Sequence, residues 1–226
     1  MNGQQIDLRR SNSWLLKLGD VSTPELVEVF AINTLAPFLL NARLQPLLAA
    51  TAKMGAPAAA ESEAEEEDEE EEEDEEEEED KGGDGSGREG ADGAAGSSSS
   101  SSSSSSRRGA AFIVNVSAME GKFYRHKTAN HPHTNMAKAA LNMMTRTSAP
   151  ELAAAHAIFM TAVDTGWIND ENPREKAARI AERHDFQTPI DEIDAAARVL
   201  HPVFHGVRTG EPMCGVFLKD YAETEW

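Results

Sequence analysis

The chain has 226 residues and a formal net charge of −19, and residues 61–80 supply nearly all of it because 18 of them are Asp or Glu. The remainder carries 22 acidic residues (40 less 18) against 21 basic ones. That balance leaves no basic surface for a phosphate backbone, which excludes a nucleic-acid-binding module.

The single cysteine, Cys214, excludes an internal disulfide framework and a cysteine-rich zinc site. The first twenty residues contain no apolar run of the kind found in secretory signals. No stretch approaches the ~20 apolar residues that span a bilayer. We therefore expect a soluble cytoplasmic protein without a membrane partner, and an organelle address stays open.

A helix is expected to begin at Ser22, where a hydroxyl cap is followed by Pro24 and by an acid in the first turn. The next segment, LVEVFAINTLAPFLLNARLQPLLAA, repeats apolar residues at helical spacing. Pro37 interrupts the hydrogen-bond ladder, so a kink or two helices are expected. Asn33 falls on the inward face just before that kink.

Residues 55–109 are expected to be a disordered insertion, because repelling charges are followed by a Gly-rich stretch and ten serines. The GSGREG match to a dinucleotide fingerprint is rejected, since no strand precedes it and no apolar helix follows. Removing the insertion leaves 171 residues, enough for one domain. The expected organisation is therefore an N-terminal segment 1–54, the insertion 55–109 and a C-terminal part 110–226.

After the insertion, apolar and amphipathic segments alternate as in an α/β fold. Strands are expected at 111–117, 158–163 and 213–218, and helices at about 133–155, at 171–184 and from Thr188 onward. Strand, helix and strand at these lengths form a βαβ unit with a right-handed crossover. The predicted fold class is α/β, a partial Rossmann-like parallel sheet flanked by helices.

Four short motifs appear in order on the expected elements: AINTLAPFLL with Asn33, a strand ending in Asn115-Val-Ser117, NMAKAALNMMTRT with Lys138, and VDTG with Thr165. Together they resemble the second half of the short-chain dehydrogenase/reductase family, over roughly residues 20–170 outside the insertion. The C-terminal motifs are similar to an uncharacterised branch of that family. The resemblance implies hydride transfer between NAD or NADP and a carbonyl or alcohol carbon.

In that resemblance Lys138 binds the nicotinamide ribose, Asn33 orders a water and Ser117 positions the substrate oxygen. Asn115 and Thr165 would contact the cofactor. The family's catalytic Tyr stands four residues before its Lys, and residues four apart share one face of a helix.

This sequence departs from the family at several positions. The Tyr position is Thr134, whose hydroxyl is far less acidic than a phenol with its pKa of ~10. Ser117 is one residue early, because the usual serine position is Ala118. The family's glycine-rich phosphate turn and first βαβ units would precede Met1, so the sequence predicts a fold that lacks them.

The polar residues just before the Lys138 helix are the candidates for a proton donor that replaces the missing Tyr. His133 precedes the vacant Tyr position, and imidazole titrates near neutrality. Tyr124, His126 and His131 lie in the same loop, and Ser117 and a bound water are further candidates for the proton donor. A metal site is not expected, since no carboxylate or cysteine lies at ligand spacing there.

Two hypotheses follow. The first is an oxidoreductase of short-chain dehydrogenase/reductase type, truncated and either active or inactive, that forms a homodimer through the Lys138 helix. The alternative is a non-catalytic half-domain or scaffold whose acidic tract binds basic proteins. The simpler interpretation of that tract is a solvated surface segment without a partner.

Overall fold

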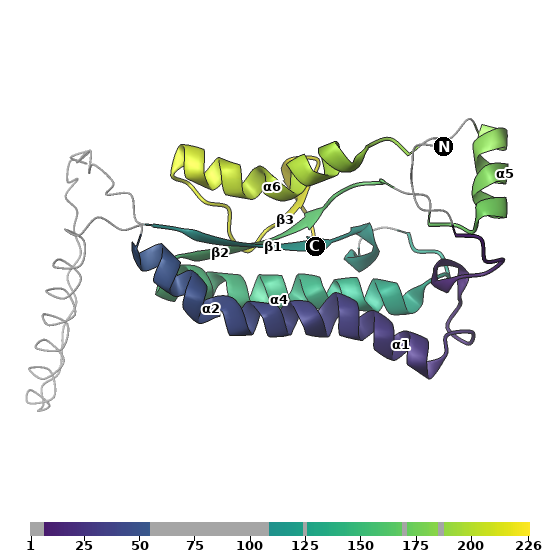
Figure 1. Ribbon diagram of the computed structural model, residues 1–226, viewed down its shortest axis with the longest axis horizontal. Coiled ribbons are helices and arrows are strands. Elements are labelled where there is room, and N and C mark those ends of the chain that lie inside the picture. Colours follow the sequence, from purple (N-terminus) through teal and green to yellow (C-terminus); the bar gives the residue numbers. More distant parts are fainter. Residues whose placement is uncertain (1–6, 55–108, 124–125, 169–170, 185–187) are drawn as a thin grey trace, which may run out of the picture. The chain divides into compact units, whose positions relative to one another are not determined.

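The computed structural model describes residues 7–54, 109–123, 126–168, 171–184 and 188–226 (Figure 1). The expected disorder of residues 55–109 lies outside this described part, apart from Gly109. The chain divides into two units, one of residues 1–52 with 110–226 and one of residues 53–109. The elements below belong to the first unit, except for the last two residues of helix α2 (Ala36–Met54).

A four-stranded sheet forms the centre of this unit, in the order β1-β2-β3-β4. Strands β1 and β2 pair in parallel along their whole length, from Ala111 opposite Ile158 to Ser117 opposite Asp164. Strand β3 is parallel to β2 and antiparallel to β4. The strands are β1 (Ala111–Ser117), β2 (Ile158–Asp164), β3 (Phe217–Lys219) and β4 (Ala222–Thr224). The predicted α/β class is confirmed.

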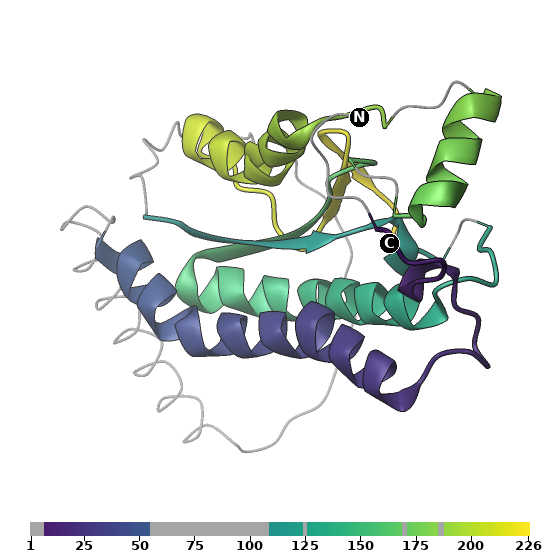
Figure 2. The same cartoon turned by 45° about the vertical axis from the view of Figure 1, so that its right-hand side comes forward.

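Helices cover the two faces of the sheet because side chains alternate along a strand. Ile113 packs into an apolar cluster with Ala149 and Leu152 of helix α4 (Pro132–His156). On the opposite face, Phe112 lies so close to helix α6 (Glu192–Thr209) that a Cβ on Gly206 would come within 2.8 Å of its ring. Figures 1 and 2 show α2 and α4 together on one face and α6 on the other.

Three shorter helical segments are η1 (Ser13–Leu15), η3 (Met119–Gly121) and α5 (Arg174–His184). Of these, η3 packs most tightly, because a Cβ on Gly121 would lie 2.7 Å from the backbone of Lys138. The turn after β1 is therefore held directly against α4.

Helix α4 matches its expected bounds closely. Pro132 stands in the first turn, where its missing N–H costs nothing. The helix stops at Ala157, which adopts a left-handed conformation and donates its N–H to Ala153 O. Along this length α4 buries seven side chains against the sheet and its neighbours.

The expected interruption at Pro37 takes the form of a π turn. Helix α1 (Thr23–Phe30) passes through η2 (Ala31–Leu35), a π-helical segment, into α2 (Ala36–Met54). Ala36 donates its N–H to Ala31 O, five residues back, and Pro37 has no N–H to give. The backbone hydrogen bonds change from four-residue to five-residue spacing over one turn, and the helix then continues as α2.

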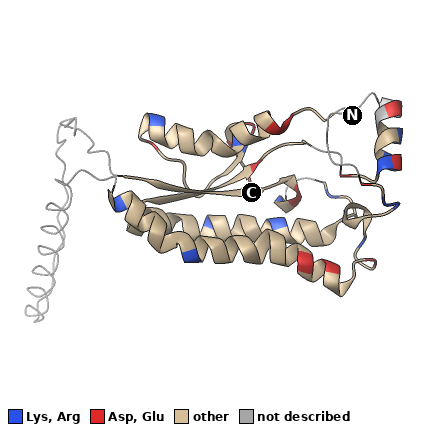
Figure 3. Cartoon of the chain, in the orientation of Figure 1, with Lys and Arg blue, Asp and Glu red and all other residues tan. Residues whose placement is uncertain are grey.

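This continuous helix, Thr23–Met54, corrects one expectation. By length and composition it is apolar enough to cross a membrane, and its apolar window is 0% buried. Figure 3 shows few charged residues along it beyond its first turns. Core helices of soluble proteins and N-terminal signals meet the same criteria, so this feature alone assigns no membrane role.

The C-terminal elements differ in detail from their expected bounds. The strand predicted at 213–218 begins only at Phe217 and is followed by β4, which the sequence did not indicate. The turn between them places Asp220 and Tyr221 at positive φ, without a glycine to signal it. Helix α6 is capped by Asp191, whose carboxylate accepts from Asp194 N–H, rather than by Thr188.

Candidate functional site

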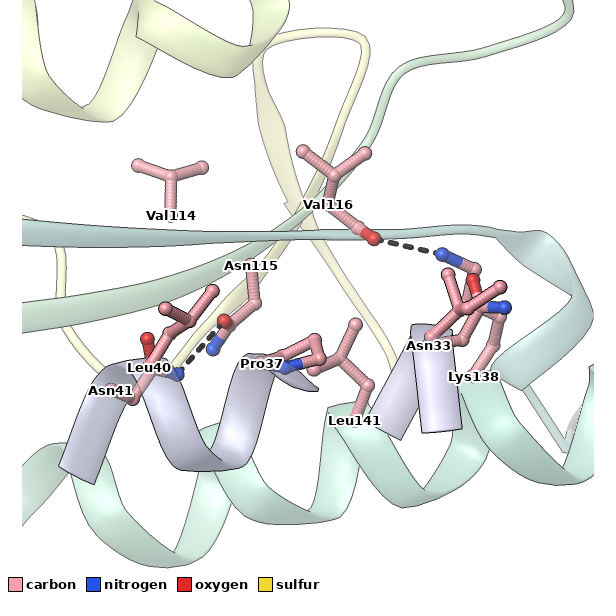
Figure 4. Close-up of a pocket in the computed structure, with 10 residues that line it drawn as sticks. Asn33, Pro37, Leu40, Asn41, Val114, Asn115, Val116, Lys138 and Leu141 are labelled. Carbon is pink, nitrogen blue, oxygen red and sulfur yellow. Dashed lines mark hydrogen bonds between the residues drawn. The ribbon is translucent and has the colours of Figure 1, made fainter. Parts of the chain in front are cut away.

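A pocket of about 300 Å³ lies between α2, β1 and α4 (Figure 4). It brings together three of the residues singled out in the sequence: Asn33, Asn115 and Lys138. The other lining residues are Ile32, Pro37, Leu40, Asn41, Val114, Val116 and Leu141. The pocket is therefore an apolar groove with one ammonium group and three side-chain amides.

Lys138 reaches the pocket from the second turn of α4. Its ammonium donates a hydrogen bond to Val116 O at 3.0 Å (Figure 4). Burial lowers the pKa of Lys138 below its usual range, and the carboxylate of Glu120 partly offsets this. The group is a partly desolvated cation beside the strand, a setting that favours contact with hydroxyl or carbonyl oxygens.

Asn33 comes from the π turn and lies beside Lys138 in Figure 4. Its amide donates to Val29 O of α1 at 3.1 Å, four residues back. Neighbouring Thr34 donates its hydroxyl to Ala137 O of α4 at 3.1 Å. One-turn π segments recur at functional sites because they displace a side chain from its normal helical position.

Asn115 belongs to a chain of polar contacts that crosses the helix–sheet interface. Asn41 donates to Asn115 Oδ1 at 3.1 Å, and Asn115 donates to Thr145 Oγ1 at 3.0 Å. The Thr145 hydroxyl in turn donates a hydrogen bond to Leu141 O at 3.1 Å. Asn41 was not among the residues predicted from the sequence, although it follows Asn33 and Pro37 at successive steps of four along the inward face.

Ser117 and Thr134 occupy different surroundings from this pocket. Ser117 is buried at the end of β1, and its hydroxyl donates to Asn142 Oδ1 of α4. Thr134 lies one turn before Lys138 on α4 and is half-buried. Neither is among the residues that line the pocket.

Thr165 directly follows β2 and is not among the residues that line the pocket. The residue before it, Asp164, is buried and pairs with Lys219 at 2.9 Å. Asp164 also accepts the N–H of Gly166 at 2.8 Å, which holds the turn that carries Thr165. Neither Asp164 nor Lys219 was among the site residues predicted from the sequence.

His133 lies away from the pocket, at the first turn of α4 and facing α1. It is 2% exposed, and its Nε2 stands 3.7 Å from Glu25 Oε1. His131 stacks on Trp14 with ring centroids 3.9 Å apart, and burial lowers the pKa of His131. His126 is exposed, and Tyr124 lies outside the described residues.

The fold itself is shared with known reductases. The NADPH-bound carbonyl reductase from chicken fatty liver superposes with a TM-score of 0.50 at 17% identity, covering 99% of this chain and 64% of that one. The carbonyl reductase Sniffer of D. melanogaster gives 0.53 at 19%, covering 92% and 59%. The chain thus spans less than two thirds of these structures. The likeness places it among α/β proteins with a Rossmann-like sheet.

Among curated proteins, the chain is 40% identical over 99 residues to an uncharacterised protein of Acanthamoeba polyphaga mimivirus. That match covers 41% of this chain and 21% of the viral protein. No family model matches the chain.

Proposed function

We propose that the pocket beside β1 is the nicotinamide-side portion of an NAD(P) site, in a protein of short-chain dehydrogenase/reductase type. The observation that carries this proposal is the meeting of Lys138 and Asn33 in one pocket, from two helices far apart in the sequence. The likeness in fold to carbonyl reductases, one of them with NADPH bound, supports the same assignment.

The residues suit a ribose and an amide better than a phosphate. One partly desolvated ammonium and three neutral amides offer donors and acceptors at fixed positions but little positive charge. When bound, a nicotinamide supplies or accepts a hydride. Lys138 would hold the ribose hydroxyls after releasing Val116 O, and Asn33 and Asn115 would orient water or substrate in the groove.

A second candidate function is cofactor binding without turnover, because neither Ser117 nor Thr134 offers a hydroxyl suited to donate a proton in the pocket. Ser117 is buried and already donates to Asn142, while Thr134 stands where the resembling family has a phenol. A general acid must have a suitable pKa within reach of the reacting atom. The related alternative, in which residues 61–80 recruit basic proteins, stays a prediction that deletion of residues 55–109 tests.

Fluorescence titration of the full chain with NADH and NADPH tests the site. We expect saturable binding that Lys138→Met weakens by ~10-fold or more, the loss typical of a hydrogen bond from a charged group. Arg146→Met, which removes an exposed charge two turns along the same helix, leaves binding unchanged. Absence of saturation at millimolar cofactor, or equal binding by the Lys138 variant, contradicts the site.

Turnover is measured separately, as loss of NADPH absorbance with a panel of carbonyl compounds. Binding without any oxidation of NADPH supports the second candidate. Oxidation that Lys138→Met abolishes supports the first.

A further inference from the structure

Helix α6 carries two histidines one turn apart, His201 and His205. Residues four apart share one face of a helix, and the two imidazole rings have centroids 6.0 Å apart. Both residues are half-buried. The pair lies on the side of α6 that meets the turn between β3 and β4, because the His201 ring contacts the Tyr221 ring edge to face, with centroids 5.2 Å apart. The two histidines therefore occupy a defined place on the fold.

The ring nitrogens of this pair are available to a ligand. Within the described part of the chain, neither imidazole takes part in a hydrogen bond or an ion pair, and both make contacts only with other rings. Their nitrogens are also absent from the buried atoms that lack a partner there, which include both nitrogens of His133. Ring nitrogens that are neither bonded to protein nor enclosed in the core are open to solvent and to dissolved ions.

The surroundings of His201 favour its neutral form, which is the form that binds metals. Burial lowers the pKa of His201 below its ordinary value of 6.5, and the neighbouring His205 lowers it further. At pH 7 the His201 ring therefore keeps a lone pair on one nitrogen. Arg198, one turn before His201, pairs with Asp220 at 3.5 Å, so these two charges offset each other beside the rings.

The spacing of the two rings suits one shared ion. Two histidines four residues apart on a helix recur as a metal-binding pair, as in the H-E-x-x-H motif. Zinc–nitrogen bonds are ~2.0–2.1 Å long, so two imidazoles on one tetrahedral ion have centroids about 5 Å apart. The rings of His201 and His205 are about an ångström farther apart than that, a difference that side-chain rotation closes without any change in the backbone.

We propose that His201 and His205 bind a divalent transition-metal ion through one nitrogen of each ring, with water in its remaining positions. Among the described residues no group of three or more His, Cys, Asp or Glu side chains is placed to hold a metal, so the protein supplies two ligands here. Imidazole nitrogens suit Cu²⁺, Ni²⁺ and Zn²⁺, whereas Mg²⁺ and Ca²⁺ prefer oxygen ligands. Cu²⁺ should bind more tightly than Ni²⁺ or Zn²⁺, as it does at nitrogen sites in general.

This site is separate from the proposed cofactor pocket. Helix α6 covers the face of the sheet opposite α2 and α4 (Figures 1 and 2), and neither histidine lines the pocket. The metal site is therefore independent of cofactor binding. Because the two rings meet only when this turn of α6 is helical, a bound ion should also stabilise the folded chain.

Calorimetric titration of the full chain with Ni²⁺ tests the site. Cys214→Ser removes the thiol as a competing ligand, and millimolar Ca²⁺ occupies the carboxylates of residues 61–80, which prefer such a hard cation. We expect Ni²⁺ binding that His201→Asn and His205→Asn each weaken by ~10-fold or more, because either change ends the joint action of two linked ligands. The double variant should bind no more weakly than either single variant.

Two further variants are matched controls. His126→Asn removes an exposed histidine from another part of the chain and should leave Ni²⁺ binding unchanged. Leu200→His combined with His201→Asn keeps the number of histidines, but it places the second one five residues from His205 and off its face of the helix. That variant should not regain binding.

Electron paramagnetic resonance of bound Cu²⁺ counts the coordinated nitrogens independently. One equivalent of Cu²⁺ should show two nitrogens in the Cys214→Ser chain and fewer after His205→Asn. The proposal is overturned if that spectrum shows a single nitrogen, or if Ni²⁺ binding is absent or unaffected by the histidine changes. It is also overturned if His126→Asn weakens binding as much as they do. Should His201→Asn fail to fold without its contact with Tyr221, His205→Asn decides the outcome.

Discussion

Helices α2 and α4 lie on the same face of the sheet, but the sheet holds them very differently. Helix α4 buries seven side chains, among them Leu141 and Leu152, whereas α2 buries only Ala52. Leu48 and Ala49 of α2 pack against the apolar cluster while only partly buried, and Asn41 of α2 and Thr34 of the preceding η2 add hydrogen bonds to β1 and α4. Burial of apolar area is the main source of stability, so α4 belongs to the core and α2 is an attached layer.

The largest expected difference between the two helices is in the unfolding free energy lost when one leucine on each is replaced by alanine. Leu141→Ala, at a position 2% exposed, should lower the free energy of unfolding by ~3 kcal/mol through lost burial and the cavity left behind. Leu47→Ala, at a position 65% exposed, should change it by less than ~0.5 kcal/mol. Urea denaturation followed by circular dichroism compares the two. Equal losses would show that α2 is as firmly packed as α4.

A smaller effect is expected from cutting the polar link between α2 and β1. Asn41→Ala leaves the buried Asn115 Oδ1 without its donor and should cost ~1–2 kcal/mol. Hydrogen exchange should accelerate in α2 and stay unchanged in α4. Thr51→Ala is the control, because that hydroxyl bonds only within α2, to Leu47 O. Unchanged exchange in α2 would mean that other contacts hold the helix.

The smallest effect is a pH dependence that belongs to Lys138. Its pKa is lowered in the folded chain by burial, so between that value and the ordinary pKa near 10.5 the unfolded chain binds more protons. Stability contributed by this residue therefore rises with pH across that window. The penalty is present in full below the folded pKa and fades as pH approaches 10.5.

Urea denaturation at a series of pH values up to 10.5 isolates this contribution. The difference in unfolding free energy between the wild type and Lys138→Met should change with pH in the stated direction. The same difference for Arg146→Met should stay flat over the window. A wild-type curve parallel to that of Lys138→Met would contradict the lowered pKa.

The parts of the fold that the sequence predicted are those governed by local pattern. Strand β1 and helix α4 have a continuous apolar run and a helical stripe with Pro132 and Ala157 at the ends, so their bounds were predicted within a residue or two. The turn at Asp220 and Tyr221 was not, because non-glycine residues at positive φ leave no compositional signal. The choice of a π turn over a kink also depends on tertiary packing.

The candidate site was partly predictable for the same reason. Lys138 and Asn33 were singled out by motif, and the pocket contains both. The burial of Ser117 against Asn142 could not be predicted, because it depends on which face of α4 meets the end of β1. Asn41 was overlooked although its spacing from Asn33 placed it on the inward face, and the contact with Asn115 became visible only across the helix–sheet interface.

The residues on either side of the long acidic and serine-rich segment meet in one place. Ala52, near the end of α2, and Ala111, the first residue of β1, belong to the same buried apolar cluster. Once two such anchors are fixed, the entropy of closing the intervening loop grows only logarithmically, by ~0.6 kcal/mol for each doubling of its length. We therefore expect that changing the number of residues between these two alanines alters the free energy of folding only slightly.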